Sequence, residues 1–285
     1  MRAPVIPDAA SPTKPTMNTR KIPKTGEAIP MLGMGTWQTF DVTPDKRAAL
    51  DDVVKTFLAA GGRVIDSSPM YGRAEQTTGD ILKSIGEIDT PFRATKVWTR
   101  GKQAGLDQMA HSRQRMGGKT IDLMQVHNLL DVDTHLPVLR EMKQAKLIRY
   151  IGVTHYSQGE LTTIEKLMRT GSLDFIQIPY NLRRRDVEKR VLPAAIETGT
   201  AVLVMRPFEE GTLFESVKGK PLPAWASEID CSSWAQFFLK FLLGHPAVTC
   251  PIPATSKVKH AADNVLAGYG RLPDEAMRAK MITAI

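Results

Sequence analysis

Four side chains that can exchange a proton or hold a charge follow short apolar runs of this sequence: Asp66, Tyr71, Lys96 and His127. An ammonium group near a phenol favours the phenolate, so Lys96 is expected to lower the pKa of Tyr71 from its usual value of about 10. Such a phenol could protonate a carbonyl oxygen while a hydride arrives at the carbon. His127 could orient the same oxygen by a hydrogen bond.

Each of these residues has an ordinary explanation when it is taken alone. A buried Asp–Lys pair is often only structural, and a histidine at the end of a strand is often a core residue with satisfied hydrogen bonds. Polar side chains at strand ends lose hydration on burial, so a group of them in one place requires a reason. Their joint placement favours a functional site.

The elements that must position these residues alternate regularly along the chain. Eight short apolar runs are separated by segments in which apolar residues have helical spacing, as between residues 48 and 58. The runs cover residues 32–36, 63–67, 92–98, 123–127, 148–154, 175–179, 201–205 and 248–252. This alternation predicts an α/β fold, the (β/α)8 TIM barrel, with a short N-terminal β-hairpin at residues 20–30 that closes the bottom. The site of such a barrel lies at the C-terminal ends of its strands, where the four residues fall.

Composition and charge exclude several classes of protein. The 285 residues include 38 Lys and Arg against 30 Asp and Glu, which gives a formal net charge of +8. This charge could attract nucleic acid or an anionic small ligand such as a phosphate-bearing cofactor. The densest basic run, Arg183–Arg185, is followed by mixed charges and is typical of a solvated face, so we expect no nucleic acid partner. The two cysteines cannot form a disulfide framework, no Cys/His spacing indicates a metal, and no run of about 18 apolar residues indicates a membrane span.

Residues 1–19 differ from the rest of the sequence. Repeated prolines and a lack of periodicity predict a disordered tail, and residues 20–285 are predicted to form a single barrel domain. The tail lacks the apolar core of a signal peptide, which favours a cytoplasmic location. The alternative is an exported, periplasmic protein whose tail is the remnant of a signal. We expect a monomer.

Five segments resemble the signatures of the aldo-keto reductase superfamily. Residues 66–75 resemble its first signature, residues 95–98 its catalytic-lysine segment, and residues 126–127 its histidine segment. Residues 32–37 resemble the first-strand motif, and residues 252–264 resemble the C-terminal cofactor motif. The likeness extends over nearly the whole chain, with the segments in the order of the family.

The resemblance implies a (β/α)8 barrel that reduces aldehydes and ketones to alcohols with NADPH or NADH. Tyr71 would be the general acid, tuned by Lys96 and Asp66, and His127 would orient the carbonyl group. The nicotinamide would carry the hydride, and the protein would supply position and electric field. We therefore expect an NADP-dependent oxidoreductase with a small-molecule carbonyl substrate.

The resemblance also implies a set of cofactor-binding residues at the strand ends. They are Gly35, Thr36, Trp37, Asp66, Thr154, His155, Gln177, Met205, Arg206, Pro207, Phe208, Gly211, Leu213, Ile252, Ala254, Thr255, Ser256, Lys257, His260 and Asn264. Gln177 would hold the carboxamide, and Arg206 could reach the pyrophosphate or the adenosine side. His155 stands where the family usually has asparagine. Met205 stands where many members place an aromatic ring against the nicotinamide, and a thioether packs there more loosely.

The choice between the two dinucleotides depends on the 2′-phosphate. Many NADPH-dependent members have lysine at the place of Ala254 and arginine at the place of His260, and this chain has neither. Lys257 and Lys259 lie at the start of a predicted helix, whose N-terminal amides and nearby cations make an anion site. NADPH is therefore favoured, with NADH as a second option. The alternative is that both lysines are ordinary surface residues.

The substrate pocket is expected to be lined by Trp37, Phe40, Met70 and Trp98 beside the catalytic tyrosine, which favours an apolar or aromatic carbonyl compound. Alternatively, the tryptophans mainly pack the wall. The chain ends soon after its last predicted helix, so we expect an open pocket and broad substrate choice.

A second function remains open at this point, namely a cofactor-binding regulatory or sensor protein of the same fold with little turnover. The departures from the family pattern at His155 and Met205 support this hypothesis, whereas the complete set of four proton-handling residues argues against it. A metal-dependent barrel hydrolase is disfavoured because the strand ends lack a His-x-His or carboxylate cluster.

Overall fold

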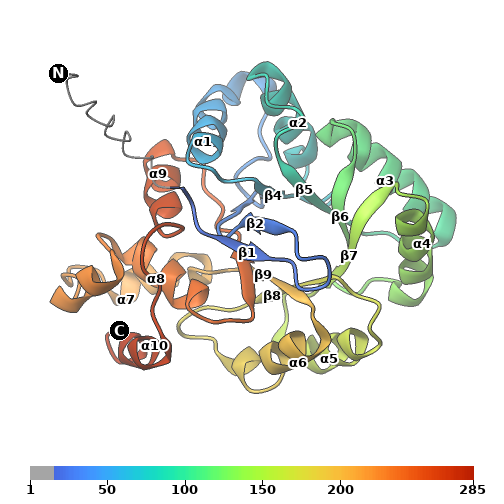
Figure 1. Cartoon of the computed structure of the whole chain (residues 1–285). Helices are drawn as coiled ribbons and strands as arrows, with labels where there is room; N and C mark the ends of the chain where they lie inside the picture. The colour runs from blue at the N-terminus through green and yellow to red at the C-terminus, as the bar shows by residue number, and fades with distance from the viewer. Residues whose placement is uncertain (1–15) are drawn as a thin grey trace, which may run out of the picture.

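The computed structural model describes residues 16–285 as a ring of eight parallel strands surrounded by helices (Figure 1). Each strand pairs with the next in sequence order, and a bridge between Gly35 and Ala254 joins the two ends of the sheet. A side chain at Gly35 would lie 2.8 Å from the carbonyl oxygen of Ile252, so glycine permits this close approach. The (β/α)8 barrel predicted from the sequence is confirmed.

The barrel strands coincide closely with the predicted apolar runs. They are β3 (Met34–Gly35), β4 (Val64–Asp66), β5 (Phe92–Val97), β6 (Ile121–His127), β7 (Ile148–Thr154), β8 (Phe175–Pro179), β9 (Ala201–Met205) and β10 (Val248–Pro251). Two further strands, β1 (Thr19–Lys21) and β2 (Ala28–Pro30), form a separate antiparallel hairpin.

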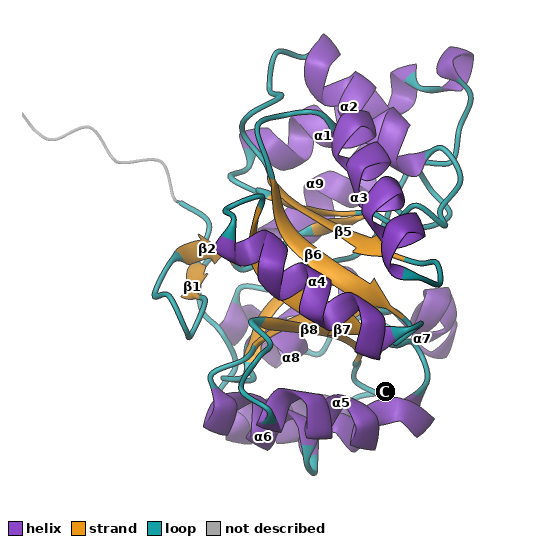
Figure 2. Ribbon diagram, turned by 90° about the vertical axis from the view of Figure 1, so that its right-hand side faces the viewer, coloured by secondary structure: helices purple, strands orange, loops and turns teal. Residues whose placement is uncertain are grey.

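The helices lie outside the strands and pack their apolar faces against them (Figure 2). The α-helices are α1 (Ala48–Ala59), α2 (Ala74–Ser84), α3 (Lys102–Met116), α4 (Val132–Gln144), α5 (Leu161–Arg169), α6 (Val191–Thr198), α7 (Thr212–Ser216), α8 (Trp234–Leu243), α9 (Val258–Leu266) and α10 (Glu275–Ile282). Short 3-10 helices span Pro44–Lys46, Gln158–Glu160, Asp186–Glu188, Glu209–Gly211 and Ala224–Ile229. In α1, for example, Leu50, Val53, Val54 and Phe57 are buried at helical spacing.

The hairpin closes the end of the barrel at which the strands begin (Figure 2). Its Ile22 and Ile29 are buried and belong to one apolar cluster with Phe92, Tyr150 and Phe175 of the barrel strands. This cluster fills the lower part of the barrel with apolar side chains. The opposite end is left for polar groups.

The folded part of the chain begins before residue 20. Met17 is buried in the apolar cluster that contains α1, and the backbone N–H of Asn18 donates to the carbonyl oxygen of Gly268 at 2.7 Å. Residues 16–19, which the sequence assigned to the tail, therefore belong to the folded part because they have a site to pack against. The rest of the predicted tail, residues 1–15, lies outside the described residues. Within residues 16–285, no helix is both long and apolar enough to cross a membrane.

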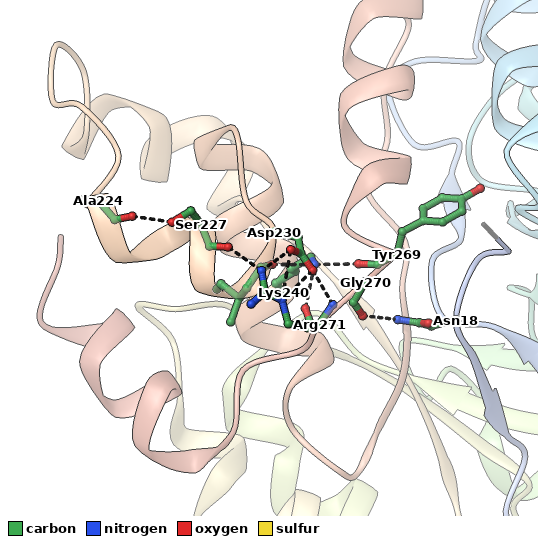
Figure 3. Close-up of polar contacts among 9 residues, drawn as sticks. Asn18, Ala224, Ser227, Asp230, Lys240, Tyr269, Gly270 and Arg271 are labelled. Atoms are coloured by element: carbon green, nitrogen blue, oxygen red, sulfur yellow. Dashed lines mark hydrogen bonds and ion pairs between the residues drawn. The ribbon is translucent and has the colours of Figure 1, made fainter. Parts of the chain in front are cut away.

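One buried lysine joins three segments on the side of α8 and α9 (Figure 3). Lys240 of α8 has no exposed surface, and its Nζ donates to the carbonyl oxygens of Ile229 and Tyr269 at 2.7 Å and of Arg271 at 2.8 Å. Next to it, Arg271 pairs with Asp230 through Nη2 and Oδ1 at 2.5 Å. These contacts connect α8 to the end of the preceding 3-10 helix and to the loop between α9 and α10.

Candidate active site

A cleft of about 880 Å³ lies over the carboxyl ends of the barrel strands. Its walls come from β8, from the ends of β3, β4, β6 and β9 and the segments that follow them, from the segments that follow β7 and β10, and from residues at the start of α8 and in α7 and α9. The predicted site residues that line it are Gly35, Thr36, Trp37, Asp66, Met70, Tyr71, His127, Gln177, Met205, Arg206, Pro207, Phe208, Gly211, Ile252, Ala254, His260 and Asn264. Residues that are far apart in the sequence therefore lie together at the C-terminal ends of the strands, where the site of such a barrel is expected.

A buried ion pair forms the floor of this cleft beneath Tyr71. Lys96 is fully buried, and its Nζ donates to Asp66 Oδ2 at 2.6 Å and to the carbonyl oxygen of Ser67 at 2.7 Å. Gln125, the register partner of Lys96 on β6, donates to Asp66 Oδ1 at 3.1 Å. Burial lowers the pKa of Lys96, but Asp66 and Tyr71 raise it more, so its pKa lies above the ordinary value. The lysine therefore keeps its positive charge.

Tyr71 lies directly over this lysine, with the Nζ atom 5.1 Å from the ring centroid. Burial raises the pKa of the phenol, Lys96 lowers it and Asp66 raises it, so that the pKa lies above its ordinary value of 10.0. The prediction that Lys96 would bring the pKa below this value is therefore wrong, because desolvation of the phenolate outweighs the attraction of the ammonium group. The hydroxyl keeps its proton at neutral pH.

His127 faces Tyr71 edge to face, with 5.7 Å between the ring centroids. Its Nδ1 lies 2.9 Å from the Ser68 hydroxyl, and that oxygen also accepts the N–H of Met70 at 3.3 Å. The Ser68 hydroxyl can donate to Nδ1 in the tautomer that carries the ring hydrogen on Nε2. Burial and the charge of Lys96 lower the pKa of His127 to about 2, so the ring is neutral. A neutral ring with its hydrogen on Nε2 can donate to a carbonyl oxygen.

Two buried polar atoms on the next strands have no hydrogen-bond partner among the described residues, namely Gln177 Nε2 and Thr154 Oγ1. The two residues are register partners on β8 and β7, and Gln177 lines the cleft. Buried polar atoms are normally paired, and a carboxamide offers both a donor and an acceptor. These residues therefore fit the carboxamide of a nicotinamide.

His155 follows Thr154 and turns toward its own loop. Its Nδ1 accepts the N–H of Ser157 at 3.0 Å, and its ring stacks on Tyr156 with 5.2 Å between centroids and 14° between planes. Burial lowers the pKa of His155. His155 does not line the cleft, whereas the adjacent Tyr156 does, and the sequence did not single out Tyr156.

The residues predicted for the 2′-phosphate lie at the start of α9. Lys257 and Lys259 are exposed, and together with burial they lower the pKa of His260. The backbone N–H of Lys257 donates to Thr255 Oγ1 at 3.1 Å. Thr255, Ser256 and Lys257 lie beside the cleft lining rather than in it, whereas His260 lines it.

The predicted substrate residues divide into two groups. Trp37, Met70 and Trp98 have 37 to 40% of their surface exposed, and Trp98 lies 6.5 Å from the His127 ring. Trp37 and Met70 line the cleft, whereas Trp98 does not. Phe40 is fully buried and does not line the cleft, because it belongs to the apolar cluster that contains the buried face of α1. The predicted cofactor residue Leu213 is likewise fully buried in the main core.

Other cleft residues were missed by the sequence analysis. They are Gln38, Thr39, Asn128, Tyr156, Glu210, Phe214, Ser233, Trp234, Ala235, Pro253 and Asp263. Several directly follow a strand or precede a helix, so the strand-end rule could have found Asn128 and Pro253. Trp234 at the start of α8 carries no such signal. The sequence could also have indicated two positioning residues, Ser68 and Gln125, because each lies two positions from a predicted catalytic residue.

Comparison with known proteins identifies relatives of this chain. Residues 31–282 match the model of the Aldo/keto reductase family. The chain is 32% identical over 269 residues to the uncharacterized oxidoreductase C215.11c of Schizosaccharomyces pombe, a match that covers 87% of this chain and 82% of that protein. It is 29% identical over 215 residues to the aldo-keto reductase YhdN of Bacillus subtilis, covering 69% of this chain and 64% of the relative's length.

The solved structures agree on the fold. An aldo-keto reductase from Klebsiella pneumoniae, solved in complex with NADPH, superposes on the chain with a TM-score of 0.75. The superposition covers 94% of each chain at 20% sequence identity. At this identity the likeness concerns the barrel alone.

Proposed function

Because the chain belongs to the aldo/keto reductase family, we propose that it reduces the carbonyl group of a small aldehyde or ketone to an alcohol, with NADPH as the hydride donor. One observation carries the proposal. Tyr71 lines the cleft, keeps its hydroxyl proton and lies over Lys96. Lys96 is fully buried and charged, and it forms an ion pair with Asp66. The tyrosine is therefore a proton donor next to a fixed positive charge that can interact with its conjugate base.

The four residues would divide the proton chemistry as follows. When bound, the reduced nicotinamide supplies a hydride to the carbonyl carbon. Tyr71 gives its hydroxyl proton to the carbonyl oxygen, which completes the alcohol and leaves a phenolate. Lys96 stabilises this phenolate, and Asp66 holds the ammonium group in place. His127 donates from Nε2 to the carbonyl oxygen and orients it toward Tyr71.

The cofactor assignment has three supports. The unpaired atoms of Gln177 and Thr154 fit the carboxamide. The exposed Lys257 and Lys259 at the start of α9 suit a 2′-phosphate. The Klebsiella pneumoniae protein of the same fold binds NADPH. NADH remains a second option, because Ala254 and His260 replace the usual cations. The cytoplasmic location and the monomeric state stay predictions from the sequence.

The test is turnover of an activated aldehyde such as 4-nitrobenzaldehyde, followed by the loss of NADPH absorbance. Tyr71→Phe is expected to lower kcat/KM by about 10²- to 10⁴-fold, because it removes the proton donor and little else. The dissociation constant for NADPH should change by less than about twofold. Tyr150→Phe is the matched control, since it removes a phenol hydroxyl at the opposite end of the barrel.

Two outcomes would overturn the proposal. Tight NADPH binding without turnover of many aldehydes and ketones would favour the sensor hypothesis. Full activity of Tyr71→Phe would show that the proton comes from another group.

A further inference from the structure

One arginine of the cleft lies near two aromatic rings from different loops. The Cζ atom of Arg206 lies 5.9 Å from the ring centroid of Trp37, which follows β3, and 5.3 Å from that of Tyr156, which follows β7. Tyr156 is itself stacked on His155. The guanidinium group therefore contacts aromatic rings from two loops that follow different strands.

The terminal nitrogen atoms of this guanidinium group remain available to bind a ligand. Its Nε pairs with Glu210 Oε1 at 3.2 Å, and this carboxylate is 52% exposed. Among residues 16–285, the terminal nitrogen atoms of Arg206 donate no hydrogen bond. Contacts with two aromatic rings limit the orientations of the group, and its terminal N–H groups remain available to an anion in the cleft.

The position of Arg206 also indicates a binding role. It is the only lysine or arginine among the described cleft residues. Although burial is the main influence on the Tyr71 phenol and raises its pKa, Arg206 lowers that pKa, which places its charge within reach of the reacting group. Its backbone has φ of 54°, a left-handed conformation that disfavours a long side chain. Strain of this kind is concentrated at functional sites.

We propose that Arg206 binds a carboxylate of the substrate, so that the enzyme prefers carbonyl compounds that carry a carboxylate over their neutral counterparts. This proposal rests on the reductase function proposed above. A planar fork of N–H donors matches the two oxygens of a carboxylate. The exposed side chains of Trp37 and Met70, which both line the cleft, give the rest of such a molecule an apolar wall. The Arg206 side chain is only 25% exposed, and a less hydrated charge pairs more strongly with an anion.

The test compares substrates that differ only in this charge. The pairs are 4-carboxybenzaldehyde with methyl 4-formylbenzoate, and benzoylformate with its methyl ester. The wild type should prefer at least one acid, and Arg206→Met should lower kcat/KM for that acid by about 10- to 100-fold while the ester changes by less than about twofold. Arg206→Lys should restore part of the loss. Arg184→Met is the control, because Arg184 pairs with Glu209 and does not line the cleft.

Binding measurements separate this proposal from the reductase function. Calorimetry with benzoate and the protein–NADP⁺ complex needs no turnover, and Arg206→Met should weaken benzoate binding by a similar factor. Turnover of the esters tests the reductase function independently of the acids. The carboxylate proposal fails if the wild type prefers both esters. It also fails if Arg206→Met weakens NADPH binding and slows acid and ester equally, because Arg206 would then be a cofactor ligand.

Discussion

Lys96 and Lys240 are both fully buried, yet their surroundings differ in kind. Lys96 meets the carboxylate of Asp66 and one carbonyl oxygen, and its pKa is raised because these partners outweigh burial. Lys240 meets three carbonyl oxygens and no carboxylate, and burial lowers its pKa. A full negative charge compensates for lost hydration, whereas backbone dipoles do so only in part.

The two environments match two different tasks. Lys96 lies under Tyr71 at the open end of the barrel, where a positive charge can act on a reacting group. Lys240 lies in α8, where its hydrogen bonds join this helix to the preceding 3-10 helix and to the loop after α9 (Figure 3). We infer that the first lysine is needed for chemistry and the second for structure.

The largest expected effect comes from Lys96→Met. Loss of the ammonium group should lower kcat/KM by about 10²- to 10⁴-fold, because the Tyr71 phenolate and the Asp66 carboxylate both lose their compensating charge. Steady-state kinetics on protein whose fold is checked by circular dichroism would measure this effect. The same kinetics on folded Lys240→Met should give a kcat/KM within about threefold of the wild type. Equal losses in both variants would remove the distinction between the two lysines.

The next largest effect is on stability. Lys240→Met removes the donor from one buried and two partly buried hydrogen bonds to carbonyl oxygens, and we expect the free energy of unfolding to fall by about 3 kcal/mol. Urea denaturation at neutral pH would measure the change. A loss below about 1 kcal/mol would mean that water or a shifted backbone satisfies the carbonyl groups.

The smallest effect is a difference in pH dependence. The pKa of Lys240 is lower in the folded state than its ordinary 10.5, so the unfolded chain binds more protons between these two values. The stability of wild type relative to Lys240→Met should therefore rise with pH in that window. The pKa of Lys96 is raised, so its contribution should stay constant below 10.5 and decline only at higher pH.

Urea denaturation from about pH 8 to pH 11 would reveal these slopes, which are at most about 1.4 kcal/mol per pH unit for one proton. Slopes of the same sign for the two variants would contradict the opposite pKa shifts.

The sequence by itself determined the barrel, because apolar strand runs and helical apolar spacing are local patterns. Their regular alternation buries the apolar residues together in a (β/α)8 ring. It also placed Asp66, Tyr71, Lys96 and His127 at strand ends, and parallel strands bring their carboxyl ends together. The structure brings Asp66 within 2.6 Å of Lys96 across 30 positions of sequence, as this rule predicts.

Only the tertiary structure decided the balance of forces at each side chain. The direction of the Tyr71 pKa shift depends on how far burial removes water from the phenol, and the burial of Phe40 depends on the apolar cluster that it forms with α1. The partners of Lys240 and Arg206 come from loops that are distant in sequence. Solvation and packing are sums over all neighbours, whereas the apolar pattern of a strand or helix is written in consecutive residues.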